Sequence, residues 1–200
     1  MKNTKKTIWY ALLIIIFIIG LVGVFNQLVQ GHVVTGINKQ VPWGVYVAAF
    51  TFFIGISTGS TLIGFLIYVF NIKDLKPLEF RAVTLSLITL IGAVFFVMLD
   101  VGDPIRMMKV PFFLRNTTSV FFYSSLSYYA FIALMLFLFL ALAKLKKDPE
   151  NEKLQKRIRL MSIIAFPAAM IIVLVPDGAL FSFVKAREFW NRPLILPHFA

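Results

Sequence analysis

The sequence predicts an all-α integral membrane protein, a bundle of about five transmembrane helices. Of its 200 residues, 60% are hydrophobic and only 14% are charged, and the mean hydropathy is +0.87. A soluble domain of this size cannot bury so much apolar surface in one core, so lipid must solvate most of it. A segment in lipid has to satisfy its own backbone hydrogen bonds, which favours helices.

Five apolar segments are long enough to cross a bilayer, because a spanning helix needs about 20 residues. These segments are residues 8–30, 43–70, 82–101, 118–143 and 160–184. Each ends at a charged residue or at a break that contains Pro or Gly. The first segment follows a basic start, but it is too long for the core of a signal peptide and no small-residue cleavage site follows, so we expect a retained span.

The last ten residues, 191–200, begin what resembles a sixth apolar segment. So short a segment cannot cross the membrane. Either the chain is the N-terminal part of a longer protein or its end lies at the membrane interface, and we expect the former.

The distribution of basic residues predicts the topology. Thirteen Lys and Arg precede the first span or lie in residues 71–81 and 144–159, whereas the alternate connections carry seven. The positive-inside rule therefore places the N-terminus in the cytoplasm of a multi-pass protein of the cell (cytoplasmic) membrane. The net charge of +11 is concentrated between apolar runs, which indicates topology and contact with lipid headgroups, and not nucleic acid. Residues 144–159 are expected to form a solvated loop.

Several kinds of site are excluded by composition. The chain has no Cys, so it cannot bind an iron–sulfur cluster through thiolates. Its two His residues, His32 and His198, are not within predicted spans, which argues against a haem held by paired His. No phosphate-binding loop, no nucleophile elbow and no metal-ligand spacing occurs, so a self-contained ATPase, hydrolase or metal site is not indicated.

Three irregular connections fall on the predicted outer face, namely 31–42, 102–117 and 185–193. They mix charged and amide side chains with Trp, Pro and apolar residues, as loops do when they fold back onto helix ends. We expect them to converge on a docking surface or a binding site.

Two acidic residues lie at the outer ends of spans, Asp100 in the third and Asp177 in the fifth. Acids in or near a bilayer are costly and usually face the bundle interior or a water-filled cavity. Arg106 could fold back to pair with either, so a salt bridge and a proton-transfer role are both open. Pro176 and Gly178 flank Asp177 and should interrupt the helix, which makes this region a candidate cavity wall.

Other candidates lie near the first connection. His32 is either an ordinary interface residue or a proton acceptor near neutral pH. Trp43 and Tyr46 are either interfacial aromatics or a flat wall for an aromatic headgroup. Gly55 and Gly59 have the four-residue spacing that lets helices approach closely, and Ser60 and Gly64 repeat the interval, so packing inside the bundle is expected there.

With these residues considered, the chain resembles the NrfD/PsrC family, the membrane subunits of polysulfide-reductase-like complexes. The resemblance rests on "TGINKQVPWGVYVAAFTFFIGISTGSTLIG", on "LDVGDPIRMM" followed by "FLRNTTSVFFY", and on "AREFWNRPLILPHF". It covers nearly the whole chain. Full-length members are about twice as long, so the resemblance implies that this is the N-terminal half.

The resemblance implies a quinone-reactive subunit of a respiratory oxidoreductase complex that is not an enzyme by itself. Such a subunit exchanges electrons between an exchangeable quinone of the menaquinone or ubiquinone type and a ferredoxin-like iron–sulfur subunit, which serves a catalytic subunit, often with molybdopterin. Trp43 and Tyr46 would then line the quinone pocket, with Asp100 and Arg106 at the headgroup or on the proton path. Asp100, Asp177 and His32 would be the proton-transfer candidates.

Two other functions are open from the sequence. Broken helices and intramembrane acids also suit a small transporter or half of one, although the polar residues gather at helix ends and not at mid-membrane. A purely structural anchor for an external subunit is the third possibility.

Overall fold

The computed structural model describes residues 2–37, 44–102, 105, 108–109, 120–172 and 178. Its elements are the helices α1 (Lys2–Gln30), α2 (Val45–Val69), α3 (Glu79–Val101), α5 (Val120–Leu145) and α6 (Glu152–Ile172), with short 3₁₀ helices η1 (Gly31–Thr35) and η2 (Lys73–Leu78). No strand occurs in these ranges. The predicted all-α class is confirmed.

Four helical segments of the described chain are long and apolar enough to cross a membrane. They are Thr4–Thr35, Val45–Val69, Lys73–Val101 and Phe122–Leu145, and they coincide with the first four predicted spans. The predicted fifth span, 160–184, overlaps α6 as far as Ile172. Nearly all of its remainder lies outside the described residues, as does the predicted sixth segment.

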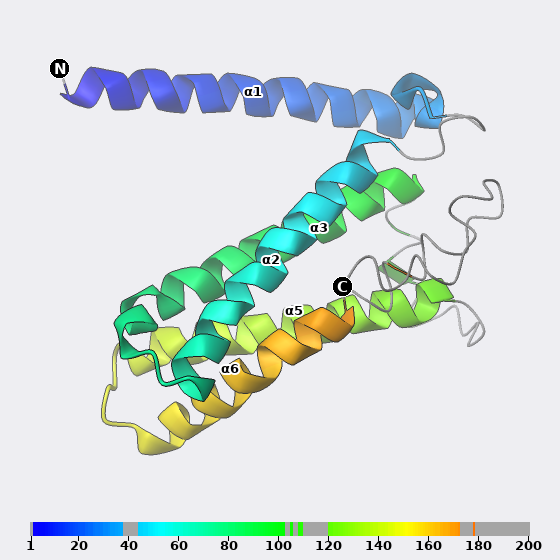
Figure 1. The fold of residues 1–200 in the computed structure, drawn as a ribbon. Helices are drawn as coiled ribbons and strands as arrows, with labels where there is room; N and C mark the ends of the chain where they lie inside the picture. Colours follow the sequence, from blue (N-terminus) through cyan, green and yellow to red (C-terminus); the bar gives the residue numbers. More distant parts are fainter. Residues whose placement is uncertain are drawn as a thin grey trace.

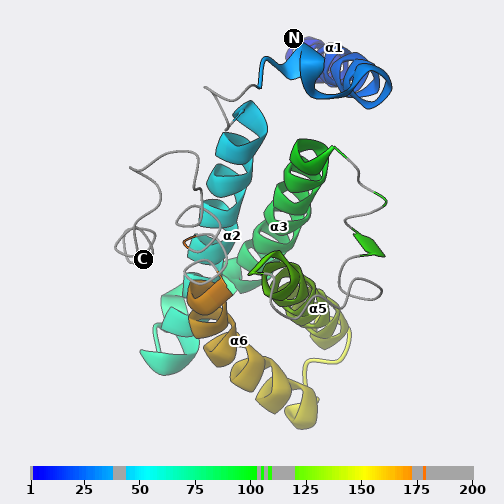
Figure 2. The same ribbon diagram turned by 90° about the vertical axis from the view of Figure 1, so that its right-hand side faces the viewer.

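Helices α2, α3, α5 and α6 form an antiparallel bundle in which each helix packs against two others (Figures 1 and 2). Helix α2 contacts α3 and α6, and α5 contacts the same two. Consecutive helices reverse direction, so the start of α2, the end of α3, the start of α5 and the end of α6 lie at one end of the bundle (Figure 1). We call this the α3-terminal end; η2 and the α5–α6 connection lie at the opposite end.

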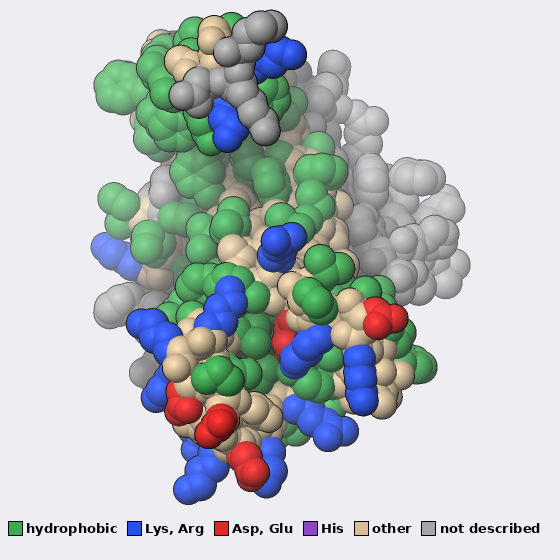
Figure 3. Space-filling model, turned by 90° about the vertical axis from the view of Figure 1, so that its left-hand side faces the viewer, with side chains coloured by type: hydrophobic (Ala, Val, Ile, Leu, Met, Phe, Trp, Pro, Cys, Tyr) green, Lys and Arg blue, Asp and Glu red, His purple; other side chains and the backbone are tan. Residues whose placement is uncertain are grey.

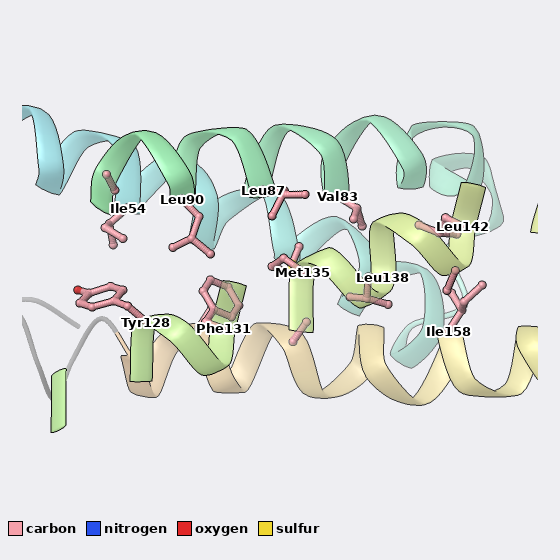
Figure 4. Close-up of a cluster of buried hydrophobic side chains, with 14 of the residues drawn as sticks. Ile54, Val83, Leu87, Leu90, Tyr128, Phe131, Met135, Leu138, Leu142 and Ile158 are labelled. Carbon is pink, nitrogen blue, oxygen red and sulfur yellow. The ribbon is translucent and has the colours of Figure 1, made fainter. Parts of the chain in front are cut away.

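The bundle core is apolar and runs along α3 and α5 (Figure 4). Leu90, Met135, Leu138 and Ile158 are fully buried in it. They come from three helices, so the core ties α3 and α5 to the first turns of α6. Lipid tails are as apolar as these side chains, so burial stabilises the bundle through van der Waals packing and not through removal of apolar surface from water.

Small and hydroxylated residues of α2 make its close contacts. The Ser57 hydroxyl lies 3.0 Å from the Ser86 hydroxyl and donates to the Ser86 carbonyl at 3.0 Å. A Cβ added at Gly64 would lie 3.3 Å from the Cβ of Ser162 on α6. The packing predicted for this stretch of α2 is confirmed at Ser60 and Gly64, which are buried, and is wrong at Gly55 and Gly59, because no atom lies within 4 Å of a Cβ added at either. The buried face of α2 is rotated away from them.

Helix α1 stands apart from the bundle. It runs at an angle to the other helices and approaches them only near its C-terminal end (Figure 1), and none of its apolar spanning window is buried. A hydrogen bond from Gln27, near the C-terminal end of α1, joins α1 to α3.

The predicted loop 144–159 is mostly helical, which corrects the expectation. Helix α5 continues to Leu145 and α6 begins at Glu152. Asn151 caps the new helix, since its side-chain oxygen accepts a hydrogen bond from the Leu154 amide at 3.0 Å. The charged residues that follow are good helix formers. Their polarity therefore keeps this segment in water, but it does not prevent a helix.

Candidate functional site

A buried glutamine joins three helices at the α3-terminal end. Gln27 of α1 is only 3% exposed. Its amide nitrogen donates to the Leu99 carbonyl of α3 at 2.8 Å, and its amide oxygen accepts a hydrogen bond from the Tyr46 hydroxyl of α2. The Leu99 carbonyl also accepts the Gly102 backbone N–H at 3.3 Å, so Gln27 is a second donor to a carbonyl in the last turn of α3.

Aromatic packing positions Tyr46. Its ring centroid lies 6.2 Å from that of Phe96 on α3. The Phe96 ring in turn stacks on Phe53 at 5.5 Å. This aromatic column between α2 and α3 holds the Tyr46 hydroxyl at the helix ends, where it meets Gln27.

A crevice of about 360 Å³ opens between α1 and the start of α2. Gln27, Thr35 and Tyr46 supply its polar groups, and apolar residues including Val34 and Ile37 complete the wall. The Thr35 hydroxyl donates to the His32 carbonyl at 2.7 Å, so its oxygen can still accept. The crevice thus combines an apolar surface with a few hydrogen-bonding groups, which is the usual character of a small-molecule site.

His32 and Asp100 lie near each other at the same end of the bundle, each close in the chain to a residue that lines the crevice or bonds to its lining. The His32 ring packs against Gly102, because a Cβ added there would collide with Nε2. Gly102 has φ 76° and ends α3 in the left-handed conformation that favours glycine. The ring is close enough to interact electrostatically with the Asp100 carboxyl. Within the described residues, His32 Nδ1 and Asp100 Oδ1 are buried without a hydrogen-bond partner. Such buried, unpaired atoms are available to a ligand or a water.

The structure thus brings together three residues that the sequence singled out, namely His32, Tyr46 and Asp100. Trp43, Arg106 and Asp177 lie outside the described residues, so their predicted roles stay predictions. Sequence reasoning missed Gln27, although an amide near the end of an apolar span was a usable signal, since polar residues at membrane depth are usually functional or paired. Its partners, 19 and 72 residues away in the chain, could not be read from the sequence.

A second polar cluster lies at the opposite end of the bundle. Glu79, only 3% exposed, pairs with Lys76 at 2.7 Å between Nζ and Oε2. Lys76 also donates to the Tyr68 hydroxyl. In the part of the chain that the structure describes, no group of three or more His, Cys, Asp or Glu side chains is placed to hold a metal ion.

The fold and the site define a helical membrane protein with several spans. At one end of its bundle, a group of polar residues lies around a crevice. The sequence profile of the NrfD family, described as polysulphide reductase, NrfD, matches residues 33–200. The chain therefore belongs to the NrfD family, whose members are integral membrane proteins usually found in the cell membrane.

The similar curated proteins are named as subunits of oxidoreductases. The chain is 28% identical over 193 residues to the "Hdr-like menaquinol oxidoreductase integral membrane subunit" of Archaeoglobus fulgidus, covering 96% of this chain and 46% of that one. It is 24% identical over 216 aligned positions to a selenate reductase subunit of Mesobacillus selenatarsenatis, covering 92% and 50%. A third relative, the "Menaquinone reductase, integral membrane subunit" of Nitratidesulfovibrio vulgaris, is 29% identical over 103 residues, covering 52% and 25%.

The chain spans about half the length of the first two of these relatives. No solved structure matches it.

Proposed function

We propose that this chain is the quinone-reactive membrane subunit of a respiratory oxidoreductase complex, or a part of that subunit. It would pass electrons between membrane quinone or quinol and an iron–sulfur partner. The observation that carries the proposal is the crevice lined by Gln27 and Tyr46 beside His32 and Asp100. The names of two relatives, a menaquinol oxidoreductase and a menaquinone reductase subunit, support a quinone and favour the menaquinone type over ubiquinone.

The residues of the crevice fit a quinone headgroup. Such a headgroup is flat and apolar, with two oxygens that accept hydrogen bonds when oxidised and donate them when reduced. Tyr46 donates to Gln27, so its oxygen keeps a lone pair for a hydroxyl donor, and Thr35 is in the same position. Gly23 on α1 leaves the crevice open. The mouth lies beside α1, whose exposed apolar surface gives a lipid-soluble molecule lateral access.

Proton transfer is the chemical task assigned to His32 and Asp100. Reduction or oxidation by two electrons moves two protons, and the bound quinone supplies the redox chemistry itself. A carboxyl and an imidazole that are close enough to interact electrostatically can accept and release these protons in turn, through their unpaired atoms. Asp177 stays a third candidate.

The electron partner must be another subunit, since the chain has no Cys to hold an iron–sulfur cluster through thiolates. We propose a ferredoxin-like iron–sulfur subunit docked at the α3-terminal end, connected to a catalytic subunit of the molybdopterin type. The name of the selenate reductase relative supports a place in a reductase complex. The charge distribution supports an outer location for this end.

Binding of a quinol mimic tests the crevice. The purified protein in detergent is titrated with a fluorescent hydroxyquinoline N-oxide, whose emission changes on binding. Tyr46→Phe removes one hydrogen-bonding hydroxyl and is expected to weaken binding roughly 2- to 10-fold. Tyr10→Phe, on the exposed face of α1, is the matched control and should bind as wild type. Equal affinity of the Tyr46→Phe and wild-type proteins would contradict the placement of the ligand.

Turnover tests the acid. In the assembled complex, Asp100→Asn keeps the size of the side chain but cannot release a proton, so quinol turnover should fall by about 100-fold or more while binding of the mimic is retained. Asp74→Asn, exposed at the opposite end, makes the same change of charge and should leave turnover unchanged. Unchanged turnover in Asp100→Asn would remove Asp100 from the mechanism. Absence of any binding by the wild-type protein would favour the structural anchor.

A further inference from the structure

A large cavity lies at the opposite end of the bundle from the crevice. Its volume is about 800 Å³, and it lies where the end of α2, η2, the end of α5 and the first turns of α6 meet. Its polar wall consists of Tyr68, Asn71, Lys76, Gln155, Lys156 and Arg159. Three of these residues are cationic and none is acidic.

The cations are not equally compensated. Lys76 is paired with the buried carboxylate of Glu79 and is held over the Tyr68 ring, with Nζ 4.3 Å from the ring centroid. Lys156 and Arg159, one turn apart on α6, form no salt bridge with any residue that the structure describes. Arg159 lines the cavity and is close enough to Tyr68, on the same wall, to interact with it electrostatically. The cavity therefore carries two uncompensated positive charges.

The basic surface extends beyond this cavity. A neighbouring cavity of about 660 Å³ shares Lys76 and adds Arg81 and Lys146 to its lining. In Figure 3, Lys and Arg side chains gather over the lower part of the bundle, with fewer Asp and Glu among them. An anion at the first cavity would thus lie within a broad positive field.

The rest of the wall is apolar and marks the level of the membrane surface. Ile67, Val69 and Leu145 line it, and the last two are the final residues of two spanning segments. Phe70 and Ile72, which follow in the chain, are exposed. A ligand seated here would place its charged part among the cations and an apolar part against these residues.

We propose that this cavity binds the phosphodiester headgroup of an anionic phospholipid. Arg159 is suited to the phosphate because a guanidinium offers paired N–H donors to two phosphate oxygens, and Lys156 adds a second charge. The glycerol and the first carbons of the acyl chains would lie along Val69 and Leu145. The positive-inside prediction puts this end in the cytoplasmic leaflet, where anionic lipids attract basic segments. A free phosphate would use the same cations but not the apolar wall, so we assign the site to a lipid.

Native mass spectrometry of the purified protein tests the proposal. The protein is released from detergent after titration with phosphatidylglycerol or with zwitterionic phosphatidylethanolamine, and bound lipids are counted. We expect one phosphatidylglycerol to bind more tightly than phosphatidylethanolamine. The variant Lys156→Gln/Arg159→Gln should weaken that binding about 30-fold, taking a typical contribution for two basic residues near a membrane surface.

The control is Lys153→Gln/Arg157→Gln. These residues are exposed on the same helix and do not line the cavity, so the net charge changes equally while the site is left intact. Neither pair is in the core, and far-UV circular dichroism checks that both variants fold. The proposal expects the control to bind phosphatidylglycerol as wild type does.

Three results would overturn the proposal. Equal weakening in the two double variants would mean a diffuse surface charge. Equal binding of the two lipids by the wild-type protein would mean that the cavity does not select an anion. Displacement of phosphatidylglycerol by inorganic phosphate at equal concentration would mean a site for the free anion.

Discussion

Replacing Gly102 with alanine tests the contact between His32 and the end of α3. Gly102 has φ 76°, and an L-residue in the left-handed region costs about 1–2 kcal/mol. The added methyl group would also collide with the His32 ring, and forcing extra atoms into a packed site costs about 1–3 kcal/mol. Gly102→Ala should therefore destabilise the protein by about 2–5 kcal/mol, the sum of the two effects.

Gly36→Ala separates the two contributions. Gly36 has nearly the same backbone conformation, φ 70°, but no atom lies within 4 Å of a Cβ added there. It should cost only the backbone part, about 1–2 kcal/mol. In a His32→Ala background, Gly102→Ala should also cost only that part, so the double-mutant cycle isolates the ring contact.

Two measurements read this out. The free energy of unfolding comes from SDS titration in mixed micelles, followed by far-UV circular dichroism. The affinity for the fluorescent quinol mimic reports the displacement of His32 from its place beside the crevice, and it should fall in Gly102→Ala but not in Gly36→Ala. If both glycine variants lose the same stability and keep wild-type affinity, His32 does not pack against Gly102 and the proposed proton-transfer pair is wrong.

Two further predictions concern the bundle, and the same SDS titration checks both. Leu138→Ala should lower the free energy of unfolding by about 2–5 kcal/mol, because the side chain is 1% exposed within the core. Leu140, on the same helix, is 58% exposed, so Leu140→Ala should lower it by well under half of that. Similar losses in the two variants would contradict the assigned core. Gly64→Leu should destabilise by about 1–3 kcal/mol through collision with α6, whereas a Cβ added at the exposed Gly59 meets no atom within 4 Å, so Gly59→Leu should be neutral or stabilising.

The spans themselves were predictable from local sequence. Each is a continuous run of apolar residues, and hydropathy within about 20 residues decides whether such a run enters lipid. The prediction of a loop over 144–159 was wrong because it was drawn from charge alone. Charged residues indicate that a segment contacts water, whereas the formation of α6 from Glu152 depends on helix propensity and on the cap at Asn151.

The site was predictable in part. The sequence singled out His32 and Asp100 because ionisable residues at span ends are costly unless they are used or paired, and Tyr46 because an aromatic ring there can form a flat wall for a headgroup; their roles stay predictions. Gln27 was overlooked, since its significance comes from partners on two other helices. The cavity at the opposite end was not predicted at all, because Tyr68 and Arg159 are far apart in the chain and only the packing of α2 against α6 brings them to one cavity.

By itself the sequence determined that the chain enters the membrane, where each of its first four helices crosses, and which residue types gather at the helix ends. The tertiary structure alone decided which face of each helix is buried. Gly55 and Gly59 have the same four-residue spacing as Ser60 and Gly64, yet only the second pair is buried, because the rotation of a helix about its axis depends on all of its neighbours together. The same holds for Gln27 and His32, whose roles arise only where the end of α1 meets the end of α3.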